Sequence, residues 1–162
     1  MSILGLVCFG LVFVSLLALS ACFSGCETAM LSLSPMQVQR IKERQGKAGA
    51  RLERLLAQPE VLLSTLLIGN TFVNAALASV GLTFLARLGW VPTAYLEVSS
   101  IVMVTLFVLL FGEISPKQFA IRHAEALVPF MTRLLAVAIP LLRPLSWCLQ
   151  KLLRPFRKML TP

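Results

Sequence analysis

The chain has 162 residues, of which 57% are hydrophobic and 14% are charged, with a formal net charge of +8. Soluble domains carry about 25% charged residues and about 45–50% apolar ones, so the composition excludes an ordinary soluble enzyme and favours a membrane protein. The basic surplus favours anionic lipid headgroups over nucleic acid as partners, because the sequence shows no basic face interleaved with aromatic residues.

Charge-free runs predict three membrane spans and an all-α membrane protein. A span needs about 20 residues, and no charged residue precedes Glu27, so the first span is 3–23. The second span is 61–86. The third is about 91–112, and its length requires that Glu113 be tolerated at or inside the membrane. With the segment 27–60, these spans form a predicted core domain of residues 1–121.

The segment 27–60 is expected to be helical and to lie on the cytoplasmic side. Its pattern predicts a surface helix over 37–44 and a second one over 51–57, with Gly46 and Gly49 separating them. Pro59 suits the first turn of the second span, where a missing N–H group costs nothing.

The pattern of residues 122–162 predicts a juxtamembrane arm rather than a fourth span. We expect this arm to be a long amphipathic helix that is kinked by prolines. Its longest charge-free stretch is 134–142. The basic residues along one face belong at lipid headgroups, and the candidates are Arg122, Arg133, Arg143, Lys151 and Arg154. Alternatively, the apolar residues pack onto the spans and the arginines only reach outward to the headgroups.

The distribution of Lys and Arg predicts the orientation in the plasma or inner membrane. Six of the fifteen basic residues lie in 27–60 and eight lie from Lys117 onward. Basic loops stay in the cytoplasm, so we expect the N-terminus outside and the C-terminus in the cytoplasm.

The four cysteines are interpreted as small hydrophobic residues: Cys8, Cys22, Cys26 and Cys148. No C-x-x-C pair is present, which argues against a zinc site. Residues 19–22 resemble a lipoprotein cleavage box, but no positively charged region precedes them.

Polar clusters interrupt the three spans, and intramembrane polar residues are functional candidates by default. They are 23–28, with Ser24, Gly25, Glu27 and Thr28; 69–74, with Gly69, Asn70 and Asn74; and 111–117, with Gly112, Glu113 and Pro116. All lie toward the cytoplasmic half of their spans and can converge. Hydroxyl, amide, carboxylate and freed carbonyl oxygens suit Mg²⁺ or Na⁺, and broken spans that meet at polar residues are typical of transporters.

Each cluster also has a structural alternative. The first helix could simply end beside a solvated Glu27, and the asparagines could only join helices through hydrogen bonds. Glu113 could pair with Lys117 at the membrane boundary. An enzyme is not expected, because the chain has one histidine and no aspartate and contains no glycine-rich phosphate loop.

In these clusters the chain resembles the transmembrane domain of the CorC/cyclin M (CNNM) family of magnesium transporters. The matching stretches are Phe-Ser-Gly-Cys-Glu-Thr-Ala at 23–29, Leu-Ile-Gly-Asn-Thr at 67–71 with Asn74, and Gly-Glu-Ile-Ser-Pro-Lys at 112–117. They occur in the family's order, on the first, second and third spans, and the resemblance covers nearly the whole chain.

The resemblance implies a homodimer that exports Mg²⁺, with inward Na⁺ as the driving ion. It implies Ser24, Asn70 and Glu113 as first-rank Mg²⁺ ligands, and the second-rank ligands are Glu27, Thr28, Gly69 and Asn74. Gly25, Gly112 and Pro116 would supply the helix breaks. Members of the cyclin M type often carry Asn where Glu27 stands.

The family normally continues into cytoplasmic CBS domains, which are absent from these 162 residues, so we expect a piece of a longer protein. A different hypothesis is a membrane module that senses Mg²⁺ or holds a partner without transporting the ion.

Overall fold

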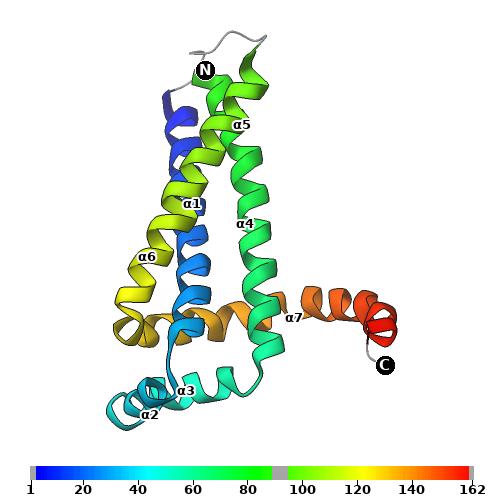
Figure 1. Ribbon diagram of the computed structural model, residues 1–162. Coiled ribbons are helices and arrows are strands. Elements are labelled where there is room, and N and C mark those ends of the chain that lie inside the picture. The colour runs from blue at the N-terminus through cyan, green and yellow to red at the C-terminus, as the bar shows by residue number, and fades with distance from the viewer. Residues whose placement is uncertain (1–2, 89–94, 161–162) are drawn as a thin grey trace. The chain divides into compact units, whose positions relative to one another are not determined.

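The computed structural model describes residues 3–88 and 95–160, and almost all of them are helical (Figure 1). Of residues 149–160 the helix is described without the side chains. The elements are α1 (Ile3–Ser32), α2 (Pro35–Arg44), α3 (Lys47–Leu56), α4 (Pro59–Leu88), α5 (Leu96–Phe107), the π-helix η2 (Val108–Ile114), α6 (Ser115–Arg122) and α7 (Ala124–Leu160). No strand occurs among the described residues, which confirms the all-α fold class.

Four helical segments have the length and hydropathy of a membrane span: Leu4–Ser32, Pro59–Arg87, Val98–Arg122 and Ala124–Leu145. Three spans were predicted. The fourth candidate lies in the arm, where isolated charged residues interrupt the apolar sequence while the average hydropathy stays high. The start of the predicted third span, residues 91–94, lies outside the described residues.

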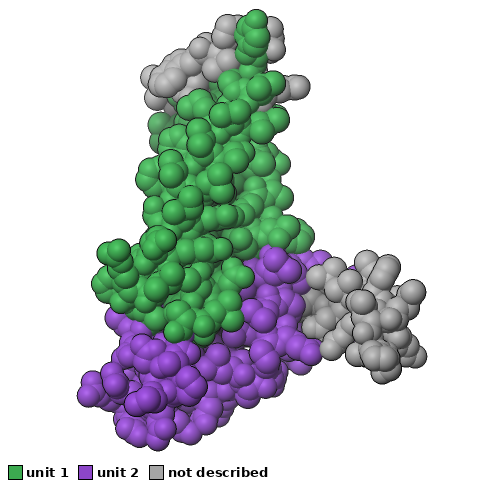
Figure 2. Space-filling view, in the orientation of Figure 1, with its two compact units in different colours: residues 1–32, 70–124 green, residues 33–69, 125–162 purple. Residues whose placement is uncertain are grey.

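The chain divides into two compact units, residues 1–32 with 70–124 and residues 33–69 with 125–162 (Figure 2). In the first unit, α1 packs against η2 and α6. The rings of Phe13 on α1 and Phe84 on α4 stack with centroids 6.3 Å apart. Gly81 of α4 sits against Val104 and Phe13 so closely that a Cβ there would collide with Val104. This unit is therefore a bundle in which α1, α4 and α5 meet at a small residue.

In the second unit, α2 and α3 form a tight helical pair. Ser34 caps α2: its Oγ accepts from Gln37 N, and Gln37 Oε1 accepts from Ser34 N, which satisfies two N–H groups that a helix start leaves free. Gly46, with φ of +41°, makes the turn, as predicted. The expected interruption at Gly49 is wrong, because Gly49 lies buried inside α3.

Side chains and ion pairs hold the second unit together. Ile41 of α2 and Leu52 of α3 are fully buried. Lys42 Nζ lies 2.7 Å from Glu53 Oε1 across the pair. α7 buries one face, at positions three or four apart: Ala124, Val128, Met131, Leu135 and Ala138. That spacing is typical of an amphipathic helix.

We predict that Gly49→Ala destabilises this unit. An added Cβ would lie 2.5 Å from Lys42 Cα and 2.9 Å from Ile41 O, and since both are backbone atoms, α2 and α3 would have to separate. We expect a loss of about 1–3 kcal/mol, measured as a lower thermal midpoint in detergent. Gly10→Ala is the matched control, because its Cβ would meet only the Phe84 ring at 3.7 Å. Equal midpoints for the two variants would contradict the close approach.

Candidate functional site

Two serines lie on one buried face of α1. Ser20 and Ser24 are four residues apart and both have a relative exposure of 0%, so they lie above one another on the helix. Ser24 Oγ has no hydrogen-bond partner among the described residues. A buried hydroxyl without a partner costs free energy, so the Ser24 hydroxyl is available to bind a ligand.

Two asparagines of α4 contact the first of these serines. Ser20 Oγ donates to Asn74 Oδ1 at 2.8 Å, and Asn70 Oδ1 lies 3.5 Å from the same hydroxyl. Asn70 and Asn74 are half-buried and four residues apart, as the sequence predicted. The structure thus connects α1 to the second polar segment through Ser20, a residue that the sequence analysis did not select.

Glu113 of η2 completes the group. Asn74 Nδ2 donates to Glu113 Oε1 at 3.2 Å. No basic side chain lies within ion-pair distance of this carboxylate in the described part of the chain. Lys117 Nζ instead lies 4.0 Å from Glu27 Oε2. The alternative pairing of Glu113 with Lys117 is therefore absent from the described part of the chain. We call Ser20, Ser24, Asn70, Asn74 and Glu113 the polar cluster.

The backbone that carries Glu113 is π-helical rather than broken. Ser115 N donates to Leu110 O, five residues back, and α6 then begins with Pro116 in its first turn. Proline lacks an N–H group and crowds the carbonyl four residues earlier, which here belongs to Gly112. A wider π turn relieves that conflict, and such turns are frequent at functional sites.

The predicted break at Gly25 is wrong, because α1 continues as an α-helix to Ser32. A Cβ on Gly25 would lie 3.7 Å from Pro116 O, which is an ordinary contact, whereas one on Gly112 would lie only 3.0 Å from Ser20 Oγ. Small residues let membrane helices approach closely. Gly112 is therefore the glycine that brings η2 close to α1.

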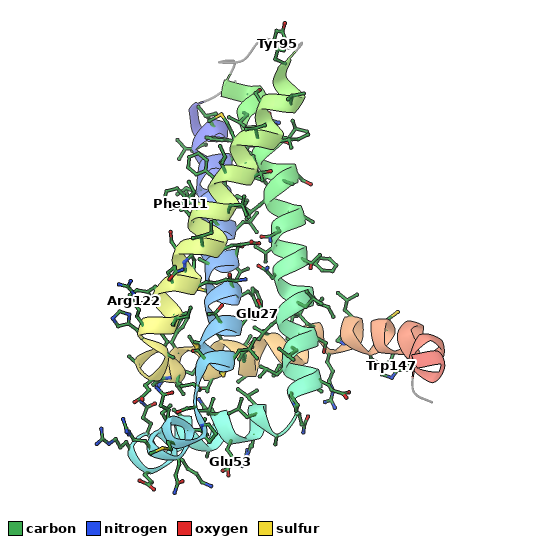
Figure 3. The ribbon with its side chains drawn as sticks, in the orientation of Figure 1. Glu27, Glu53, Tyr95, Phe111, Arg122 and Trp147 are labelled. Atoms are coloured by element: carbon green, nitrogen blue, oxygen red, sulfur yellow. The ribbon has the colours of Figure 1, made fainter. Side chains whose placement is uncertain are left out.

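Of the second-rank residues, Asn74 lies at the centre of the contacts, and the other three take less part in them. Glu27 and Thr28 are half-buried on α1, and Figure 3 labels Glu27 there. Gly69 is buried in the uninterrupted helix α4, where its carbonyl belongs to the helical hydrogen-bond pattern. No freed carbonyl is therefore expected at Gly25 or Gly69.

The residues assigned to lipid headgroups are exposed wherever they are described. Arg122, Arg133 and Arg143 are exposed, and Arg122 points outward from the end of α6 (Figure 3). The side chains of Lys151 and Arg154 lie outside the described residues.

Ser20 is the residue that the sequence analysis missed. It was considered only as part of the cleavage-box resemblance at 19–22. The signal that could have identified it is its spacing of four residues from Ser24, which repeats the spacing of Asn70 and Asn74.

The polar cluster offers two hydroxyl groups, two amides and one carboxylate. All of these groups offer oxygen atoms as hard donors. Within the described ranges, no group of three or more His, Cys, Asp or Glu residues could hold a metal ion. Such donors suit Mg²⁺, which keeps several waters and binds through one or two carboxylates.

Comparison with known proteins identifies the family of the chain. The chain matches the cyclin M transmembrane N-terminal domain family over residues 11–162. It is 34% identical to a UPF0053 protein of Haemophilus influenzae over 81% of this chain and 30% of that protein. It is 32% identical to the UPF0053 inner membrane protein YfjD of Escherichia coli over 88% of this chain and 32% of that protein.

A eukaryotic relative is more distant. The metal transporter cnnm-1 of Caenorhabditis elegans is 26% identical over 85% of this chain and 16% of its own length. The chain thus spans about a third of its bacterial relatives and less of the animal one. Because the family match runs through almost all of its residues, the chain belongs to the cyclin M (CNNM) transmembrane-domain family.

Proposed function

We propose that this chain is the membrane domain of a metal-ion transporter whose cargo is Mg²⁺. The observation that carries the proposal is the Glu113 carboxylate, which lies inside the candidate span Val98–Arg122. An ionised group at that place is expensive unless it is paired. Its contact is a neutral amide, Asn74, so a cation is the partner that the site lacks.

The donor set favours Mg²⁺ over transition metals. Carboxylate, amide and hydroxyl oxygens are hard ligands, whereas zinc and copper prefer nitrogen and sulfur. A single carboxylate lets the ion leave again, which transport requires. The name of the Caenorhabditis elegans relative, a metal transporter, supports the same class of cargo.

The remaining features follow from the family resemblance. We propose export of Mg²⁺ driven by inward Na⁺, a homodimer, and no enzymatic activity. We also propose that the N-terminus lies outside and the basic segments lie in the cytoplasm. A flux that persists at full rate without a Na⁺ gradient would remove the coupling from this proposal and leave the cargo intact.

We predict that Glu113→Gln abolishes Mg²⁺ binding and flux while keeping the size of the side chain. Loss of the only carboxylate in the polar cluster should lower the apparent Mg²⁺ affinity by at least about tenfold. The measurement is the rise of the thermal midpoint with Mg²⁺, since a ligand of the folded state stabilises it, together with Mg²⁺ efflux from proteoliposomes.

Glu53→Gln is the matched control for this experiment. Glu53 is an exposed acid paired with Lys42, so its loss should leave both readouts near the wild-type values. Wild-type flux in Glu113→Gln would contradict the site. Binding by the wild-type chain without flux would identify the non-transporting module instead.

We predict that Ser24→Ala separates stability from binding. Because Ser24 Oγ is buried without a partner, its removal should keep or raise the thermal midpoint in the absence of Mg²⁺. The loss of one oxygen ligand should lower Mg²⁺ affinity by roughly 3- to 10-fold. Ser79→Ala, which removes a hydroxyl bonded to Ala75 O, should leave the affinity unchanged. Unchanged affinity in Ser24→Ala would exclude Ser24 from the ligands.

A further inference from the structure

A cavity outside the polar cluster lies in the second unit, between the junction of α3 with α4 and the facing side of α7. Its volume is about 250 Å³. Its polar lining comes from Arg51, Arg54 and Gln58, together with Thr132 on α7, and apolar side chains such as Val61, Leu62 and Ile139 form the rest. The lining therefore combines two basic side chains and an amide with hydrocarbon surface.

The two arginines are available for an external anion. Arg51 and Arg54 are three residues apart on α3, so they lie on the same side of that helix, and both are exposed. Nearby acids are engaged elsewhere: Glu53 pairs with Lys42, and Glu125 pairs with Arg40. In the described part of the chain, no acidic side chain lies within ion-pair distance of Arg51 or Arg54.

The cavity lies at the end of a candidate membrane span. Gln58 directly precedes α4, and Val61 and Leu62 belong to its first turns. The candidate span itself begins at Pro59. The first turns of a span are at the depth of the lipid headgroups, where the phosphates of a leaflet meet the start of the acyl chains.

We propose that this cavity binds one anionic glycerophospholipid of the surrounding leaflet. The guanidinium groups of Arg51 and Arg54 hold the phosphate, with the Gln58 amide as a further donor. The start of an acyl chain lies along Val61, Leu62 and Ile139. A cavity of about 250 Å³ accommodates the headgroup region while the chains continue into the bilayer. This site is distinct from the exposed basic residues of α7, and it does not depend on Mg²⁺ transport.

The test is lipid retention by the full chain. Native mass spectrometry, after incubation in micelles with phosphatidylglycerol or phosphatidylcholine, reports which lipid stays bound. We expect one phosphatidylglycerol to be retained in preference to phosphatidylcholine. The double variant Arg51→Ala with Arg54→Ala should weaken phosphatidylglycerol binding by at least about tenfold.

Two further variants separate a built cavity from general charge attraction. Arg44→Ala with Lys47→Ala removes the same charge from neighbouring exposed positions outside the cavity, and it should retain the lipid like the wild type. Ala136→Trp fills the cavity from an exposed lining position without changing charge, and it should lose the lipid. Thermal midpoints of all variants verify that they are folded.

Three results would overturn the proposal. The wild type could show no preference between the two lipids. The control pair could lose the lipid as fully as the cavity pair, which would indicate unspecific attraction. Inorganic phosphate could displace the lipid completely, which would indicate a site for a soluble anion.

Discussion

The hydrogen bond from Asn74 Nδ2 to Glu113 Oε1 connects α4 to η2 at 3.2 Å, and the polar cluster is arranged around it. Inside a bilayer no water is available to solvate a carboxylate, so the protein itself has to supply its partners. Asn74 is one such partner, since its amide nitrogen donates to the carboxylate. Its amide oxygen in turn accepts a hydrogen bond from Ser20 Oγ at 2.8 Å. One acidic residue thus links three helices of the first unit.

Close packing permits this arrangement. Gly112 leaves room for Ser20, because an added Cβ would lie 3.0 Å from Ser20 Oγ. Pro116 prevents regular α-helical hydrogen bonding at Gly112, and the π turn that results sets the position of Glu113. Gly112 and Pro116 therefore act on helix approach and helix register, rather than by breaking the span.

The sequence predicts the all-α class, the sites of the polar residues and the turn at Gly46 because each depends on local signals. Charge-free runs mark spans, and residues four apart share a face. The contribution of Ser20 is not local, since it depends on which α4 residues face α1. Continuation of α1 past Gly25 was also missed, because a single glycine costs a helix only about 1 kcal/mol, which the rest of a long helix outweighs. The fourth candidate span, in the arm, was missed as well. Isolated charged residues interrupt its charge-free runs, although the average hydropathy of the segment stays high.

We propose that the polar cluster holds the transported cation. The most direct measurement is an experimental structure of the chain in a lipid membrane with Mg²⁺ present. We expect an ion with ligand oxygens of the polar cluster, Glu113 among them, at about 2.0–2.1 Å. An ion bound only at other acidic residues, or none at the cluster under saturating Mg²⁺, would contradict it.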